Sequence, residues 1–276
     1  MGAEEIAARI WPGREVQLEP LGGGITNHNF IVDCDGERFV LRIAGADTEL
    51  LGIDRSAEHR AAQIAAELGV GPDVVDFVEG SLVTRFVDGR PVPMEETRRP
   101  EVLKEIARIL RRVHEGPAFS TRFDSFRVVE TYYETAVAHG VQVPAAYDEA
   151  RARADGIEES LGVRPEQPCH NDLLNANFIR SPGGIRIVDW EYAGMGDVFF
   201  DLANFSVNHQ LSEAESDLVL DAYFGQVRDE DREHLRLMRF MSDFREAMWG
   251  VVQQGISDLD FDFKRYADEH FDRALA

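Results

Sequence analysis

The chain is poor in cysteine and contains no long apolar segment. Its two cysteines, Cys34 and Cys169, belong neither to a CxxC motif nor to a Cys/His spacing typical of metal sites. A disulfide framework is therefore not indicated, and a reducing compartment is the simplest interpretation. No stretch approaches the roughly 20 consecutive apolar residues that a membrane-spanning helix needs. Glu4 and Glu5 occupy the region where a signal peptide carries positive charge, so we expect a cytoplasmic protein.

Basic residues are scarce as well. The chain has 29 Lys and Arg against 51 Asp and Glu, which gives a formal net charge of −22. Such an acidic surface repels phosphate backbones and anionic lipids, so neither nucleic acid nor a membrane is an expected partner. The charge suits a cationic small-molecule substrate, but acidity is also a common solubility or salt-adaptation trait.

The first third of the chain is rich in β-type runs. They are GREVQLEPL (13–21), NHNFIVDCDG (27–36), ERFVLRIAG (37–45), DVVDFVEG (73–80) and SLVTRFVDG (81–89). Asp35-Gly36 and Glu79-Gly80 are placed to turn two hairpins, and the alanine-rich segment from Asp54 to Leu68 predicts a helix. We therefore expect residues 1–87 to form an α+β lobe with a five-stranded antiparallel sheet and one helix.

From Met94 onward the pattern is helical. In residues 95–116 apolar side chains recur with a period of about 3.6 residues, which is typical of an amphipathic helix. Four later segments have the same character: Phe126 to His139, Ala145 to Leu161, Glu213 to Phe224 and Asp229 to Gln254. We expect residues 88–276 to form a larger, mostly helical lobe, joined to the first near Arg85 to Gly89.

A loop rich in short polar side chains interrupts this helical half. It reads HNDLLNAN (170–177), and the strand-like run IRIVDWEY (185–192) follows it. Phosphoryl transfer on a kinase-like scaffold requires one Asp facing the acceptor hydroxyl, with an Asn and a second Asp as oxygen ligands of Mg²⁺. Asp172, Asn177 and Asp189 have the spacing that this arrangement needs. A lone HxD would be weak evidence, but the full pattern is specific.

These two segments resemble the catalytic and metal-binding motifs of the aminoglycoside phosphotransferase superfamily, which has a bilobal protein-kinase-like fold. The DxEY form of the second motif, and the segment AMWGVVQQGISDLDFDFKRYADEHFDR (247–273), are similar to choline and ethanolamine kinases in particular. The resemblance runs from about Gly22 to Arg273. It implies ATP and Mg²⁺ as cofactors, Asp172 as catalytic base, Asn177 and Asp189 as metal ligands, and His170 as a structural brace.

The N-terminal lobe contains the parts that such a kinase uses to bind nucleotide. The turn LGGGITNHNF (21–30) is glycine-rich, so its backbone amides can approach phosphates closely. Arg42 takes the position of the phosphate-binding cation, where choline kinases resemble this chain in using Arg, and Glu58 is its expected partner. The full set of expected nucleotide-binding residues is Gly23, Gly24, Thr26, Asn27, Arg42, Glu58, Arg85 and Val87. A glycine-rich hairpin and a surface ion pair are the plain structural alternatives.

The acceptor pocket is expected to hold a cationic alcohol by aromatic faces and carboxylates. The candidates are Glu191, Tyr192, Glu246, Trp249, Phe261 and Tyr266, with Phe263 near them; core packing is the alternative for Phe261 and Phe263. Choline kinases often carry two Trp three positions apart here. This chain has Glu246 at the earlier position and Trp249 at the later one, which favours a less methylated amine such as ethanolamine, whose N–H groups can bond to a carboxylate.

The leading hypothesis is a kinase that transfers the ATP γ-phosphoryl group to an amino alcohol, choline first or ethanolamine. Another kinase of the superfamily, acting on an aminoglycoside, thiamine or a sugar-like alcohol, is the second hypothesis. A catalytically inactive nucleotide-binding protein is the third. A protein kinase is disfavoured because no DFG or APE segment follows the HND motif.

Overall fold

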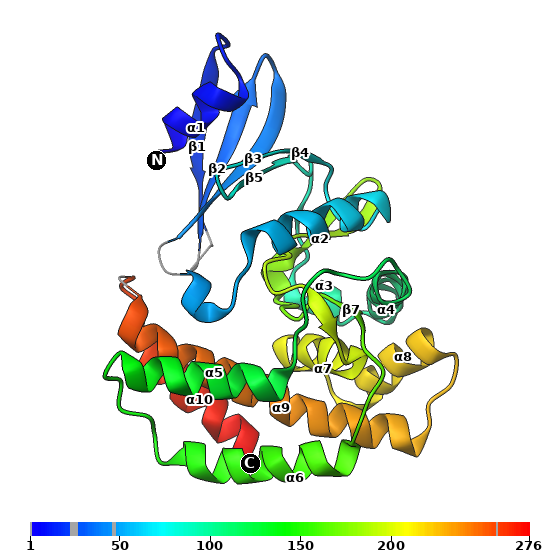
Figure 1. Ribbon diagram of the computed structural model, residues 1–276. Coiled ribbons are helices and arrows are strands. Elements are labelled where there is room, and N and C mark those ends of the chain that lie inside the picture. The colour runs from blue at the N-terminus through cyan, green and yellow to red at the C-terminus, as the bar shows by residue number, and fades with distance from the viewer. Residues whose placement is uncertain (1, 23–26, 46–47, 258) are drawn as a thin grey trace. The chain divides into compact units, whose positions relative to one another are not determined.

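The computed structural model describes residues 2–22, 27–45, 48–257 and 259–276. Contacts divide the chain into two compact units (Figure 1). The first unit comprises Met1–Val92 and Ala176–Tyr192, and the second comprises Pro93–Asn175 and Ala193–Ala276. No helix in the described part of the chain is both long enough and apolar enough to cross a membrane.

The first unit is built on the expected antiparallel sheet. Its strands are β1 (Val16–Leu21), β2 (Asn27–Cys34), β3 (Glu37–Ala44), β4 (Val74–Val78) and β5 (Ser81–Arg85), in the order β1-β2-β3-β5-β4. Asp35 and Gly36 have φ values of 56° and 81°, and Glu79 and Gly80 have 50° and 78°. Both dipeptides therefore lie in the left-handed region that two-residue hairpins require. The predicted fold class is confirmed.

The first unit has a second helix that the sequence patterns did not reveal. It is α1 (Ala3–Ile10), and Ile6 and Ala7 on it are buried in one core cluster with Trp11, Phe39 and Leu41. The predicted helix is α2 (Arg55–Glu67), which starts where the Asp54 carboxylate accepts the amides of Ser56 and Ala57. A 3₁₀ turn, Thr48–Leu51, precedes it. The expectation of a single helix in this lobe was wrong because an eight-residue segment is too short to show a clear period.

The segment from Ala176 to Tyr192 belongs to the first unit, although the expected boundary assigned everything after residue 87 to the second lobe. It begins within a 3₁₀ turn (Asn175–Asn177) and continues as the hairpin of β8 (Phe178–Ser181) and β9 (Gly184–Ile187). Strand β8 also pairs with the short β6 (Arg90–Pro91). The amide of Ile187 donates to the carbonyl of Val70 at 2.7 Å. These backbone bonds attach the hairpin to the N-terminal part of the chain.

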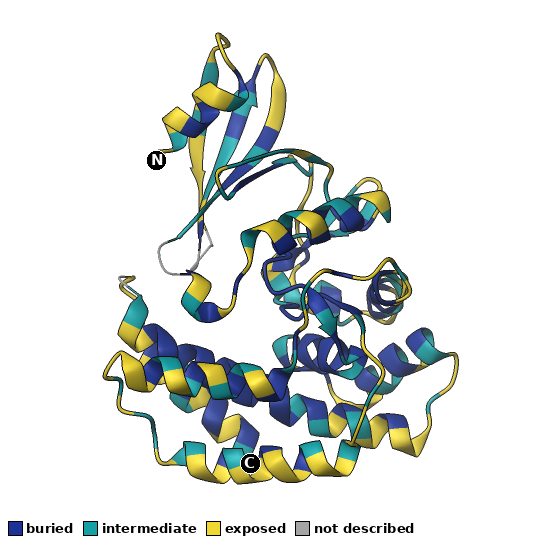
Figure 2. Cartoon of the chain, viewed as in Figure 1, coloured by how far each residue is buried: buried dark blue, intermediate teal, exposed yellow. Residues whose placement is uncertain are grey.

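The second unit is mostly helical. Its helices are α3 (Met94–Thr97), α4 (Pro100–His114), α5 (Ser125–Ala138), α6 (Ala146–Leu161), α7 (Val198–Asn208), α8 (Glu213–Phe224), α9 (Asp229–Ile256) and α10 (Phe263–Leu275). The strands β7 (Gln167–Cys169) and β10 (Gly194–Gly196) pair antiparallel. Figure 2 shows the central part of α9 buried, whereas α5 and α6 carry exposed positions along their length.

Helix α7 was not expected, and its burial explains why. Nearly every residue from Val198 to Val207 is buried, so the helix has no polar face that would create a 3.6-residue pattern. Three of its buried residues, Asp201, Asn204 and Ser206, are polar. Asp201 and Asn204 hold the loop described next.

Candidate functional site

The HND loop follows β7 and is held by one buried carboxylate. The two oxygens of Asp201 accept the backbone amides of His170 at 2.8 Å and Asn171 at 2.6 Å. Asn171 adopts a φ of 66°, a conformation that a non-glycine residue keeps only when its surroundings hold it. His114 lies 2.9 Å from the same carboxylate. Burial alone would raise the pKa of Asp201, but its hydrogen bonds with His114 and His170 lower it overall.

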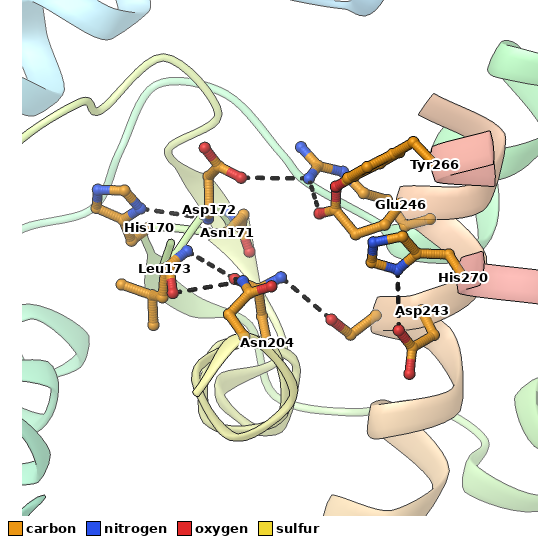
Figure 3. A network of polar contacts seen from close by, with 12 residues as sticks. His170, Asn171, Asp172, Leu173, Asn204, Asp243, Glu246, Tyr266 and His270 are labelled. Atoms are coloured by element: carbon orange, nitrogen blue, oxygen red, sulfur yellow. Dashed lines mark hydrogen bonds and ion pairs between the residues drawn. The ribbon is translucent and has the colours of Figure 1, made fainter. Parts of the chain in front are cut away.

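Asn204 fixes the next turn of the loop. Its Oδ1 accepts the amide of Leu173 at 2.6 Å, and its Nδ2 donates to Oγ of Ser242 on α9 at 3.1 Å (Figure 3). Asp201 and Asn204 are therefore functional supports that the sequence analysis missed. Their signal was present: an aspartate and an asparagine three positions apart in a mostly apolar segment must have buried partners.

Asp172 lies in this loop with 7% of its surface exposed. Its amide donates to Nδ1 of His170 at 3.2 Å, so His170 does brace the turn. Its Oδ1 accepts a hydrogen bond of 3.3 Å from Nη1 of Arg245, a residue on α9 that is 1% exposed. A buried carboxylate held this way can accept a proton from a hydroxyl that reaches it.

Arg245 links Asp172 to a second carboxylate. The same Nη1 donates to Glu246 Oε1 at 2.5 Å, and Tyr266 donates its hydroxyl to Glu246 Oε2 at 2.8 Å (Figure 3). Burial opposes ionisation of Glu246, but the charge of Arg245 lowers its pKa overall. Burial and the Glu246 charge raise the pKa of the Tyr266 phenol, which stays protonated as the donor. Arg245 was not among the expected site residues.

The first unit contains a separate cluster of charges around Arg42. One guanidinium nitrogen of Arg42 pairs with Glu58 and the other pairs with Asp189, so the expected Arg42–Glu58 pair is present. Burial would lower the pKa of Arg42, but the carboxylates of Asp189, Glu58 and Glu191 raise it, and the cation is stable. Its role in holding phosphates stays a prediction.

Arg55 extends this cluster and was missed by the sequence analysis. It lies in the first turn of α2 and donates to Glu58 at 2.6 Å, to Glu191 at 3.1 Å and to Asn27 Oδ1 at 2.8 Å. Asn27 donates its own amide to Glu191 at 2.8 Å. Burial and the Asp189 charge raise the pKa of Glu191. Glu191 therefore contacts expected nucleotide-binding residues of the first unit, and its role in the acceptor pocket stays a prediction.

Asn177 and Asp189 lie at adjacent strand ends of the first unit. The carbonyl of Asn177 accepts the amide of Val188 at 3.0 Å, which brings the two residues together, and Asp189 has a φ of 70°. A carboxylate and a carboxamide are hard oxygen donors, which is the set that Mg²⁺ takes when phosphates and water complete its shell. These residues fit a magnesium site.

A second group of possible metal ligands does not fit one. His114, Cys169 and Asp201 converge within the second unit, but burial raises the pKa of the Cys169 thiol well above its usual range. A thiolate, not a thiol, is the metal ligand. The Asp201 oxygens are also engaged by the loop amides, so this cluster is structural.

Five other residues were expected to bind nucleotide: Gly23, Gly24, Thr26, Arg85 and Val87. Gly23, Gly24 and Thr26 lie outside the described residues. Arg85 is exposed on β5, pairs with Glu37 at 3.2 Å and lies over the ring of Phe39, while Val87 is half-buried after the strand. Their contact with a nucleotide stays a prediction.

The aromatic residues expected in the acceptor pocket form one cluster in the second unit. Trp249 on α9 contacts Phe263 and Tyr266 of α10 edge to face, with ring centroids 5.7 and 5.6 Å apart. Phe261 is 44% exposed and lies against Phe263 and Tyr266. Tyr192 belongs to the first unit, and its role in the acceptor pocket stays a prediction.

The loop, the paired charges and the two oxygen donors are groups of the kind that phosphoryl transfer requires. The family model described as "Phosphotransferase enzyme family" matches residues 17–238, more than half of the chain, and the chain belongs to this family. Within it, the chain belongs to the choline/ethanolamine kinase family. A crystal structure of a choline/ethanolamine kinase family protein from Mesorhizobium loti is 30% identical, with a TM-score of 0.83, and the match covers 100% of this chain and 94% of that one.

Two other similar proteins are named ethanolamine kinase and choline kinase. Ethanolamine kinase 1 of Mus musculus is 25% identical over 95% of this chain and 84% of its own length. The choline kinase LicA of Streptococcus pneumoniae, 23% identical over 99% of this chain and 95% of that one, has the same fold with a TM-score of 0.83. The chain is therefore an enzyme, a kinase acting on an alcohol, and membership of a kinase family implies that it uses ATP.

Proposed function

We propose that this protein transfers the γ-phosphoryl group of ATP to the hydroxyl of a small amino alcohol, choline or ethanolamine. The observation that carries the proposal is the buried Asp172 in a loop whose backbone is fixed by Asp201 and Asn204. Phosphoryl transfer depends mostly on positioning and charge stabilisation, so a rigid base is the part that the acceptor needs. Relatives of this chain include proteins named ethanolamine kinase and choline kinase, which supports the substrate class.

In this mechanism Asp172 accepts the proton of the acceptor hydroxyl as the oxygen attacks the γ-phosphorus. The bond between that phosphorus and the β,γ-bridging oxygen breaks, and ADP leaves with the electron pair. Arg42, which pairs with Glu58, would donate two parallel N–H hydrogen bonds to phosphate oxygens of ATP. Asn177 and Asp189 would hold Mg²⁺, which when bound neutralises charge on the β- and γ-phosphates.

The contacts of Glu246 help to decide whether choline or ethanolamine is the preferred substrate. The sequence pattern favoured an amine that bonds directly to this carboxylate. Both Glu246 oxygens, however, already accept hydrogen bonds within the second unit, from Arg245 and from Tyr266. Its charge is balanced by Arg245, and this weakens the argument for ethanolamine. The aromatic faces of Trp249 and Tyr266 are then the groups that would select a cationic head group.

The test is coupled ADP release from the purified protein with choline, ethanolamine, thiamine and an aminoglycoside. We expect turnover with choline or ethanolamine and none when chelator removes Mg²⁺. Asp189→Ala, which removes a proposed magnesium ligand, serves as the inactive reference. Turnover of only thiamine or an aminoglycoside would refute the substrate class, and turnover that resists chelator would refute the metal.

The cytoplasmic location is likewise a proposal. Cys34 and Cys169 are both free and buried, which agrees with a reducing compartment.

A further inference from the structure

The second unit carries a pocket whose lining contains none of the residues assigned to nucleotide, metal or acceptor binding. Its volume is about 450 Å³, and its lining comes from α6, the end of α7 with the segment after it, α9 and α10. Helices α6, α9 and α10 contact one another, and the C-terminal residue of the chain lies beside α6 (Figure 1). The charged lining consists of Arg153, Arg236, Arg239, Arg273 and Asp243.

Two of the four arginines have carboxylate partners. Arg273 donates through Nε to Asp243 at 2.9 Å, and Arg236 on α9 pairs with the exposed Glu233 through two hydrogen bonds of 2.8 and 2.6 Å. Asp243 also bonds to His270 at 2.9 Å (Figure 3). The single aspartate of the lining is therefore already occupied by its own neighbours.

The other two arginines have no such partner. Arg153 donates to the carbonyl of Ala274 at 3.0 Å, and its guanidinium lies 4.6 Å from the ring centre of Phe240. Arg239 makes one long hydrogen bond, 3.4 Å, to the carbonyl of Leu211. Within the described ranges, no Asp or Glu forms an ion pair with either side chain. Each guanidinium has five N–H donors, so most donors of both remain available to a ligand.

This concentration of positive charge stands out against a chain of net charge −22. Four guanidinium groups line the pocket together with the carboxylate of Asp243, so positive charge is in excess among its side chains. Like charges at short range repel, and an anion that contacts several of them at once relieves the repulsion.

We propose that this pocket is a binding site for a small phosphate-bearing anion, with Arg153 and Arg239 as its principal contacts. The planar fork of arginine matches the oxygens of a phosphate in a bidentate geometry, which favours phosphate over a simple halide. The volume falls within the range of small-molecule sites and accommodates a diphosphate or a phosphorylated metabolite. The site is independent of the proposed kinase function, because it uses none of the residues assigned to it.

The experiment is isothermal titration of the full chain with pyrophosphate, in buffer without Mg²⁺ and at fixed ionic strength. The test variant is Arg153→Gln/Arg239→Gln. The matched control is Arg232→Gln/Arg265→Gln, which removes the same charge from α9 and α10 at exposed positions already paired with Asp217 and Glu269. Arg42→Gln is titrated as well, because pyrophosphate could also bind at the nucleotide site.

We expect saturable binding that persists in Arg42→Gln and in the matched control. In the test variant the affinity should fall at least about tenfold, the effect of losing charge-assisted hydrogen bonds. Equal affinity in the test variant and the matched control would overturn the proposal, and so would complete loss in Arg42→Gln. The test variant should keep its amino-alcohol kinase activity, so failure of this site and failure of the proposed function give different results.

Discussion

Arg245 lies with its Nη1 atom 3.3 Å from the carboxylate of Asp172, and the same atom donates to Glu246. One buried cation thus contacts two buried carboxylates, one of which is the proposed base. Removing one partner of such a group leaves uncompensated charge at a cost of about 3–5 kcal/mol.

The first prediction follows from this shared contact. Arg245→Met should lower the melting temperature and kcat, and the acidic limb of the pH–rate profile should move to higher pH because Glu246 then faces Asp172 without a cation. Arg245→Met/Glu246→Gln should recover most of the stability. The measurements are thermal unfolding and kcat against pH. An unchanged pH profile in the single variant would show that Arg245 only supports the fold.

The second prediction concerns the base itself. Asp172→Asn keeps the shape of the side chain but cannot accept the proton, so kcat should fall by roughly 10²- to 10⁴-fold. ATP binding, measured by titration, should change little. Normal turnover in this variant would remove Asp172 from the mechanism.

The third prediction concerns the phosphate-binding cation. Arg42→Ala should raise the KM for ATP and lower kcat, because the side chain would act on both bound substrate and transition state. Arg42→Lys should recover only part of the activity, since lysine lacks the bidentate fork. Glu58→Gln leaves Arg42 in place with a weaker partner. Its activity should lie between those of Arg42→Ala and Arg42→Lys. Unaltered ATP kinetics in Arg42→Ala would show that the Arg42–Glu58 pair is only a structural salt bridge.

The fourth prediction separates substrate recognition from core packing at Trp249. If its ring contacts a cationic head group, Trp249→Ala should raise the KM for the amino alcohol about 5- to 30-fold without changing that for ATP. Trp249→Phe keeps an aromatic face and should raise it less. A lower melting temperature with both KM values intact would place Trp249 in the core alone.

The fifth prediction concerns the pH dependence of stability. Burial lowers the pKa of His209 to about 4, so the folded state leaves it neutral below pH 6.5, where the unfolded chain takes up a proton. Its contribution is therefore present above pH 6.5 and is lost as the pH falls toward 4, by up to about 3 kcal/mol.

His209→Gln should flatten the unfolding free energy between pH 6.5 and 4, measured by denaturant titration at each pH. The chain offers a matched control in His139→Gln. Both histidines end a helix and bond through Nδ1 to the carbonyl four residues earlier at 2.8 Å, but His139 is exposed. An equal effect of the two substitutions would contradict the role of burial.

Local features of this protein could be predicted from its sequence because they depend on neighbours in the chain. The Asp35-Gly36 and Glu79-Gly80 turns need positive φ values, which these residue types tolerate, and they specify the hairpins of the sheet. The amphipathic helix α4 shows its own period. The HND motif and its spacing to Asp189 identified the family, since chemistry at a site requires particular residue types.

Tertiary structure decided the rest, because it depends on partners distant in the chain. Asp201 and Asn204 support the loop from a helix that is buried on all sides and so shows no period. Arg245 balances Glu246, which no pattern in the sequence reveals. Glu191 accepts hydrogen bonds from Arg55 and Asn27 because the hairpin from Phe178 to Ile187 joins the first unit through backbone bonds. Every residue other than proline has the same backbone donor and acceptor, so residue types do not predict that attachment.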